Sequence, residues 1–299
     1  MSVIENALSK LRRAAGSPDS PRAAALVTGA PVVHPAASPA GAETRYVHKR
    51  ATIDLRLLRA DGYLPDESQE RRFADYYHRV KRPLIQRAFS AKGGEDLRLI
   101  LMTSALPGEG KSFTTLNLAF SMARERDMSV LLVDADLPTA RISQVLGLQR
   151  EPGLIDALHY AALDVESLVL SSDVPGLDLL PAGAPTGASA EGVAELLSSA
   201  RMREIMTRLN RTDPRRLVLL DSPPLLVSTE ARALAQIPGQ IVLVVRVGYT
   251  PRRALLDAID QVEKKKLQGL VLNDAHITSE HGYYRYPYGA ASETLADRN

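Results

Sequence analysis

The sequence predicts an α/β domain built on a doubly wound, mostly parallel sheet. Between Leu97 and Asn273, short segments rich in Val, Leu and Ile alternate with amphipathic segments. The apolar segments do not alternate apolar with polar residues, which is typical of parallel strands covered on both faces. Several of them end in Asp or in a Gly-rich turn, and ligands bind at this edge of open α/β sheets. The function must be argued from those strand ends, because the fold class alone does not define one.

The expected elements follow in chain order. The strands are expected at 97–103, 130–134, 177–181, 217–221, 240–245 and 270–273, and the helices at 111–124, 191–210, 229–236 and 251–265. A further helix-like stretch begins near residue 68 and includes V-K-R-P-L-I. Its face of Arg79, Arg82 and Arg87 is expected to be a solvated charged face or a subunit contact.

Composition divides the chain into four regions. Residues 1–16 place Ile4, Leu8 and Leu11 on one helical face, so they predict a short amphipathic helix that docks on a membrane or partner, or stays solvated. Residues 17–50 are rich in Pro and Ala and predict a disordered linker. The folded domain is expected at 51–275. Residues 276–299 predict a flexible tail with four of the ten tyrosines: Tyr283, Tyr284, Tyr286 and Tyr288.

Charge and composition exclude several classes of protein. The 37 Lys and Arg residues against 35 Asp and Glu leave a net charge of +2, which predicts no nucleic-acid partner. The chain has no cysteine, which excludes disulfides and thiolate metal sites. No apolar run approaches the ~20 residues that a membrane-spanning helix needs. We therefore expect a cytoplasmic protein.

A phosphate-binding loop follows the first strand of the expected sheet. The sequence A-L-P-G-E-G-K-S stands between the strand L-R-L-I-L-M-T-S and the helix F-T-T-L-N-L-A-F-S-M-A, and this is a Walker A motif in its required context. Glycines let backbone N–H groups surround a phosphate, Lys111 reaches the β and γ oxygens, and Ser112 can ligate Mg²⁺. The residues expected to bind the nucleotide here are Pro107, Gly108, Glu109, Gly110, Lys111, Ser112 and Phe113.

Three carboxylates follow two other strands. Asp134 and Asp136 come after V-L-L-V, and Asp221 comes after L-V-L-L in the manner of a Walker B carboxylate. One such carboxylate alone would equally suit a helix cap or a turn. Because all three are expected at the edge that carries the loop, they predict a metal and phosphate site.

The order of these motifs resembles the bacterial tyrosine kinases. A P-loop, D-x-D after the next strand, hydrophobic-D-S-P-P and a C-terminal tyrosine cluster occur in that order. The V-K-R-P-L-I stretch and the Pro-rich linker are most similar to the subfamily associated with exosortase and exopolysaccharide loci. The resemblance implies a P-loop NTPase fold of the partition ATPase type and the cofactors ATP and Mg²⁺. It also implies autophosphorylation on Tyr283, Tyr284, Tyr286 and Tyr288, in the regulation of exopolysaccharide synthesis or export.

The same resemblance implies roles for individual residues and partners. Lys111, Asp134 and Asp136 are the expected catalytic residues, with Asp136 the first candidate to accept the tyrosine proton and Asp134 the second. Ser112, Asp136 and Asp221 are expected to hold Mg²⁺, and Asn273 to contact adenine. The expected partners are further copies of this chain, a polysaccharide co-polymerase adaptor at the inner membrane and a cognate tyrosine phosphatase. The adaptor would place the protein peripherally at that membrane.

Two motifs depart from the family pattern. The family continues D-x-D-L-R-x-P, whereas Pro138 and Ala140 stand here in place of the Arg and the Pro. The family's oligomerisation helix carries E-x-x-R-x-x-R, whereas Tyr76, Arg79 and Arg82 have that spacing here. The first departure lies beside the expected catalytic carboxylates. The second affects the contact by which the family forms rings.

Two alternatives to a kinase remain open from the sequence. A partition-type ATPase shares the fold, but its signature lysine would fall at Leu106, and leucine cannot reach a phosphate across a dimer interface. A nucleotide-bound scaffold of the polysaccharide machinery would bind the nucleotide without transferring phosphate. Under the kinase hypothesis the tyrosine tail is both substrate and switch, because each phosphate adds about −1.5 to −2 charges.

Overall fold

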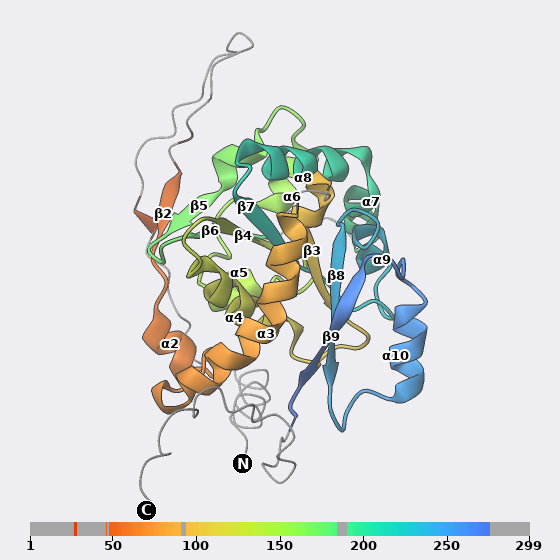
Figure 1. Cartoon of the computed structure of the whole chain (residues 1–299). Helices are drawn as coiled ribbons and strands as arrows, with labels where there is room; N and C mark the ends of the chain where they lie inside the picture. Colours follow the sequence, from red (N-terminus) through yellow and green to blue (C-terminus); the bar gives the residue numbers. More distant parts are fainter. Residues whose placement is uncertain (1–26, 29–45, 47, 91–93, 184–189, 276–299) are drawn as a thin grey trace, which may run out of the picture.

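The protein is built around a nine-stranded sheet (Figure 1). The computed structural model describes residues 27–28, 46, 48–90, 94–183 and 190–275, and the structural statements below concern these residues. The strands are β1 Val27–Thr28, β2 Lys49–Ala51, β3 Leu99–Ser104, β4 Ser129–Asp134, β5 Leu170–Ser172, β6 Leu177–Leu180, β7 Arg216–Asp221, β8 Gln240–Arg246 and β9 Leu267–Asn273. Their order across the sheet is β1-β2-β5-β6-β4-β7-β3-β8-β9. The β1–β2 and β5–β6 pairs are antiparallel and the others are parallel, which confirms the predicted doubly wound sheet.

Helices cover both faces of this sheet. They are α2 Leu55–Ala60, α3 Glu70–Ala88, α4 Lys111–Ala123, α5 Arg141–Val145, α6 Leu154–His159, α7 Ala190–Ser198, α8 Ala200–Thr212, α9 Thr229–Leu234 and α10 Arg252–Ile259, with 3₁₀ turns at Glu67–Gln69, Glu95–Arg98 and Val165–Leu168. Helices α2 to α5 pack in one hydrophobic cluster and α6 to α10 in the other. In β3, Leu99 and Leu101 belong to the second cluster, whereas Ile100 and Met102 belong to the first. Both faces of the strand are buried, which explains why its sequence does not alternate.

Two expected helices differ from those in the structure. The helix expected at 191–210 is two helices, because Ser199 interrupts it and its Oγ accepts a hydrogen bond from the Met202 N–H at 3.2 Å. Such a side-chain cap begins a new helix. The helix expected at 251–265 ends at Ile259. The helix cannot continue to residue 265, because the chain is already extended along β8 at Lys266, where its carbonyl accepts a hydrogen bond from the Ile241 N–H at 2.8 Å.

Several short elements were missed by the sequence analysis. Strand β5 pairs antiparallel with β6 and parallel with β2, and α5 and α6 also went unpredicted. Segments of three to six residues are too short to show a hydrophobic period. Strand β2 begins at Lys49, two residues before the expected domain boundary at residue 51.

The expected N-terminal helix at 1–16 and the tyrosine tail at 276–299 lie outside the described residues. So does the linker expected at 17–50, apart from 27–28, 46 and 48–50. Within the described part of the chain, none of the helices combines the length and the apolar character that crossing a membrane requires.

A buried ion pair joins the start of β7 to the 3₁₀ turn Val165–Leu168. The Arg216 Nη1 lies 2.7 Å from Glu166 Oε1, and both side chains are almost fully buried. The same guanidinium donates to the Leu209 carbonyl at 3.3 Å. Removing one partner of such a pair leaves an uncompensated charge in the core, which is far more costly than removing both.

We therefore expect Arg216→Met to lower the free energy of unfolding by about 3–5 kcal/mol. The double variant Arg216→Met/Glu166→Leu should recover much of that loss, because no buried charge is left alone. Urea denaturation at pH 7 measures both effects. The control is Arg253→Met, which breaks an exposed pair with Asp257 and should change stability by less than about 1 kcal/mol. A double variant as unstable as Arg216→Met would contradict the expectation.

Candidate functional site

The phosphate-binding loop connects β3 to α4 at the carboxyl edge of the sheet. Gly108 and Gly110 have φ angles of +79° and +84°, a backbone region that disfavours residues with a Cβ. Gly110 is the N-cap of α4, and its carbonyl accepts from the Thr114 N–H at 2.9 Å. The loop therefore leads directly into a helix N-terminus, where backbone N–H groups favour an anion.

Lys111 lies buried between two of the predicted carboxylates. Its Nζ is 3.0 Å from Asp136 Oδ2 and 3.4 Å from Asp221 Oδ2. Burial by itself lowers the pKa of Lys111, but the nearby carboxylates, chiefly Asp221 and Asp136, outweigh it and raise the pKa. The lysine therefore carries its charge at neutral pH, ready to bind an anion.

The register of three neighbouring strands brings these groups together. In the ladder between β4 and β7, Asp134 pairs with Asp221, and β7 lies directly between β4 and β3. Ser112 donates its hydroxyl hydrogen bond to Asp221 Oδ2 at 2.6 Å, and Thr115 donates to Asp221 Oδ1 at 3.0 Å. The expected cluster of loop and carboxylates is present in the structure.

Asp134 and Asp136 have different environments although they are two residues apart. Asp136 contacts Lys111, whereas Asp134 Oδ2 accepts hydrogen bonds from the backbone N–H and the hydroxyl of Ser143, both at 2.7 Å. Asp134 is 1% exposed and its Oδ1 has no hydrogen-bond partner. Burial, reinforced by the charge of Asp221, raises the pKa of Asp134 to about 7. Asp134 thus fixes the start of α5, and Asp136 faces the loop.

Glu109 is a buried carboxylate within the loop. It is 1% exposed, and its Oε2 accepts a hydrogen bond from the Leu106 N–H at 2.7 Å. Its Oε1 accepts from the hydroxyl of Thr250, in the connection between β8 and α10. Glu109 therefore ties the two ends of the loop together and attaches them to a neighbouring connection.

Asn273 and Tyr249 support the loop from the same side. The Asn273 side chain donates to the Glu109 carbonyl at 2.9 Å, and the Tyr249 hydroxyl donates to the Pro107 carbonyl at 3.2 Å. The guanidinium of Arg246 lies 5.1 Å from the centre of the Tyr249 ring. These contacts place Asn273, the expected adenine contact, against the loop backbone.

The donors at this edge suit a nucleotide and a divalent cation. Ser112, Asp136 and Asp221 offer oxygen ligands, which hard cations such as Mg²⁺ prefer. Among the described residues, no group of three or more His, Asp or Glu side chains is placed to hold a metal ion, either at this edge or elsewhere. The backbone N–H groups of the glycine-containing loop can bind phosphate oxygens, and Lys111 can neutralise the negative charge of those oxygens.

Sequence reasoning missed part of this site. It named Lys111, Ser112, Asp134, Asp136 and Asp221 from motifs. The residues that it missed as supports are Thr115, Ser143, Tyr249 and Thr250, and it gave Glu109 no structural role. The sequence pointed to only one of these residues, Thr115. It lies one helical turn after Lys111 and therefore on the same helix face, so it could have been expected near the site. Tyr283, Tyr284, Tyr286 and Tyr288, the expected phosphate acceptors, lie outside the described residues.

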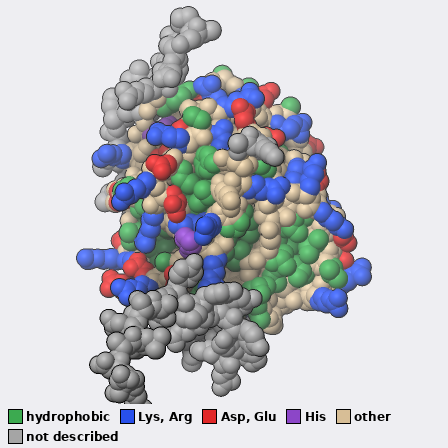
Figure 2. Space-filling model, viewed as in Figure 1, with side chains coloured by type: hydrophobic (Ala, Val, Ile, Leu, Met, Phe, Trp, Pro, Cys, Tyr) green, Lys and Arg blue, Asp and Glu red, His purple; other side chains and the backbone are tan. Residues whose placement is uncertain are grey.

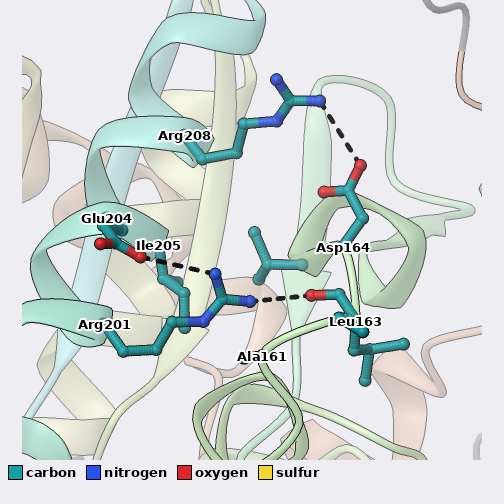
Figure 3. Close-up of a pocket in the computed structure, with 9 residues that line it drawn as sticks. Ala161, Leu163, Asp164, Arg201, Glu204, Ile205 and Arg208 are labelled. Carbon is teal, nitrogen blue, oxygen red and sulfur yellow. Dashed lines mark hydrogen bonds and ion pairs between the residues drawn. The ribbon is translucent and has the colours of Figure 1, made fainter. Parts of the chain in front are cut away.

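A cavity lies apart from this site. It has a volume of about 330 Å³ and lies between α8 and the segment 161–165. Arg201 donates to the Leu163 carbonyl and pairs with Glu204, while Arg208 pairs with Asp164 (Figure 3). Its charged side chains are thus already paired, so we assign it no part in phosphate chemistry.

The fold and the site together define a P-loop nucleotide-binding domain. In agreement, the sequence profile described as the AAA domain matches residues 97–271. The tyrosine-protein kinase YwqD of Bacillus subtilis is 33% identical over 192 residues, a match that covers 63% of this chain and 78% of that protein. Within the P-loop class, the chain belongs to the family of bacterial tyrosine-protein kinases.

Further relatives agree with this assignment. The putative tyrosine-protein kinase EpsB of Ralstonia nicotianae is 33% identical over 214 residues, covering 71% of this chain and 26% of that protein. The chain thus spans about a quarter of its length. The crystal structure of the VpsO kinase domain superposes with a TM-score of 0.57 at 27% identity, covering 70% of this chain and 98% of that one. The BceF tyrosine kinase domain superposes with a TM-score of 0.56 at 30% identity, and the match covers 67% of this chain and 76% of that one.

Gly110 generates a first prediction from this site. A Cβ at this position would lie 1.9 Å from Asn273 Nδ2, on a backbone that is already left-handed. We expect Gly110→Ala to weaken nucleotide binding by about tenfold or more, equivalent to at least about 1.4 kcal/mol. In Gly110→Ala/Asn273→Ala the clash is gone but the backbone strain stays, so binding should recover only in part.

Titration calorimetry with ADP would measure these affinities. The matched control is Gly269→Ala in β9, where an added Cβ meets no described atom within 4 Å. Equal binding by Gly110→Ala and the unsubstituted protein would show that the loop adapts at this position.

Asp134 generates a second prediction, concerning pH. Its pKa is raised in the folded protein to about 7 from a usual value of 3.8, so the folded state binds more protons than the unfolded state between these values. The contribution of Asp134 to stability should therefore fall as pH rises from about 4 to about 7, by up to about 1.4 kcal/mol per pH unit. Asp134→Asn should remove that contribution. Urea denaturation across this range without nucleotide tests it, and identical pH profiles for both proteins would contradict it.

Proposed function

We propose that this protein is an ATP- and Mg²⁺-dependent tyrosine kinase that phosphorylates its own C-terminal cluster, Tyr283, Tyr284, Tyr286 and Tyr288. The observation that carries the proposal is the Lys111 ammonium, held 3.0 Å from Asp136 and 3.4 Å from Asp221 beside the phosphate loop. Membership of the bacterial tyrosine-protein kinase family supports the choice of tyrosine as the acceptor. The tail supplies acceptors on the same chain.

Binding and orientation of ATP would fall to the loop. Backbone N–H groups from Gly108 to Ser112 would surround the phosphates, and Lys111 would move from its carboxylates to the β and γ oxygens. Mg²⁺, held by Ser112, Asp136 and Asp221, would supply charge neutralisation at those oxygens. The anchors of the loop at Glu109 and Asn273 would keep this arrangement rigid, which is the main requirement of phosphoryl transfer.

In the transfer itself, the tyrosine oxygen bonds to the γ phosphorus while the bond from that phosphorus to the bridging oxygen of ADP breaks. The phenol proton must go to a base, because its ordinary pKa is near ~10. Asp136 is the better candidate, since it lies beside Lys111 and carries no other described side-chain partner. Asp134 is occupied by Ser143 and acts as a positioning residue for the α5 end of the site.

The biological setting belongs to the same proposal. We propose a cytoplasmic role in exopolysaccharide synthesis or export, with recruitment to the inner membrane by a co-polymerase adaptor and dephosphorylation by a cognate phosphatase. Exposed Arg79 and Arg82 on α3 are available for contacts between copies of this chain. The family's acidic residue is absent from this spacing, so we propose that Asp75, also exposed, substitutes for it.

Mass spectrometry of the purified protein tests the proposal. Incubation with ATP and Mg²⁺ should place phosphate on the four tail tyrosines. Lys111→Met should reduce this phosphorylation by about a hundredfold or more, because the variant loses the positive charge that neutralises the transferred phosphoryl group. Lys266→Met is the matched control, because Lys266 is bonded to Glu263 and the Gln236 carbonyl outside the site. Its phosphorylation should be unchanged.

Other outcomes would identify the alternatives. Partner-stimulated ATP hydrolysis without phosphotyrosine would indicate a partition-type ATPase, and nucleotide binding without either activity would indicate a scaffold. Phosphotyrosine that persists undiminished in Lys111→Met would come from another kinase and would end the proposal.

A further inference from the structure

Strand β9 forms an edge of the sheet, and in the described part of the chain its single strand neighbour is β8 (Figure 1). An edge strand presents unpaired N–H and C=O groups that can template another strand. Proteins usually protect such edges with charged residues, proline or a very short strand. The opposite edge, β1, has two residues, whereas β9 spans Leu267–Asn273 and contains neither charge nor proline. Its outer edge therefore lacks the usual protection.

Apolar side chains beside this edge are also exposed. Leu270 and Leu272 of β9 are 43% and 59% exposed, and Leu256 of the neighbouring α10 is 47% exposed. Figure 2 shows hydrophobic side chains gathered on this part of the surface, over β9 and toward α10. Leu270 and Leu272 are two residues apart, so they share one face of the strand. An exposed apolar patch next to an unprotected edge indicates a docking surface.

The chain that follows β9 provides a suitable occupant. The described part of the chain ends at Ala275, two residues after β9, and residues 276–299 follow it in the sequence. The segment 276–282 ends in a glycine and is long enough to reverse the chain direction, after which 283–288 would run antiparallel to β9. A docking segment of the same chain also has a high effective concentration at the edge.

The tyrosine spacing suits this position. Tyr284, Tyr286 and Tyr288 alternate with Arg285 and Pro287, so in an extended segment the three rings share one face. That face can lie over Leu270 and Leu272. Pro287 lacks an N–H, and the alternation would direct its nitrogen away from β9, where an edge strand tolerates proline.

We propose that residues 283–288 dock on the outer edge of β9 in the same molecule, as an added antiparallel strand whose tyrosines cover Leu256, Leu270 and Leu272. Docking concerns the unphosphorylated tail and does not require kinase activity. It would place the tyrosine segment beside the strand that ends at Asn273, whose side chain holds the phosphate loop through the Glu109 carbonyl. The tyrosines would thus be withheld from catalytic sites until the segment is released.

Hydrogen exchange on the phosphatase-treated full chain tests this proposal. The outward-facing amides of β9 should exchange slowly, and Leu272→Glu should accelerate them by about tenfold or more by releasing the segment. Trypsin cleavage after Arg285 should accelerate in parallel. The matched control is Tyr160→Glu, since Tyr160 is 61% exposed and lies at the end of α6.

A second full-length variant guards against an effect of Leu272→Glu on folding. Tyr284→Ser, Tyr286→Ser and Tyr288→Ser together alter the segment alone, and they should give the same acceleration in β9. Unchanged β9 exchange in this triple variant would overturn the proposal. Protection that declines on dilution would also overturn it, because the segment would then come from a second copy. These exchange experiments are done without ATP, so they do not depend on whether the protein is a kinase. Failure of the kinase proposal would be recognised separately, by mass spectrometry after incubation with ATP.

Discussion

The site depends on one buried cation and the carboxylates around it. The Lys111 side chain is buried, where an unpaired charge would be very costly. Asp136 and Asp221 compensate it, and they reach it only because β4, β7 and β3 are adjacent and in register. A shift of one residue in either ladder would turn a carboxylate to the other face of the sheet. The charge cluster and the parallel sheet therefore depend on each other.

The phosphate loop is fixed by residues far from it in the sequence. Glu109 reaches Thr250, and Asn273 reaches the Glu109 carbonyl, so the connection after β8 and the end of β9 both support the loop. A rigid loop keeps its N–H groups in place before a nucleotide arrives, which lowers the cost of binding. The same supports link the loop to the point where the tyrosine segment leaves the domain.

The two carboxylates of the D-A-D segment illustrate how environment separates chemical roles. Asp134 is the last residue of β4, and its burial in the core, reinforced by the charge of Asp221, raises its pKa, although the hydrogen bonds from Ser143 act in the opposite direction. Asp136 lies beyond the strand end and faces a cation. One group stabilises the start of α5 and the other is available to a ligand, although the sequence presents them as a symmetrical pair.

The sequence by itself determined the local elements of this protein. It predicted the P-loop, the buried strands and the helix after the loop, because glycine conformation, strand burial and helix start signals act between near neighbours. It also placed Asp221 at a strand end. The tertiary structure decided which strands are adjacent, the antiparallel β5, and the support of the loop by Thr250, Tyr249 and Asn273. Those contacts join residues that are distant in the chain, 141 positions apart for Thr250 and Glu109 and 164 for Asn273 and Glu109, so no local pattern encodes them. They form only when the whole sheet brings the ends of its strands to one edge.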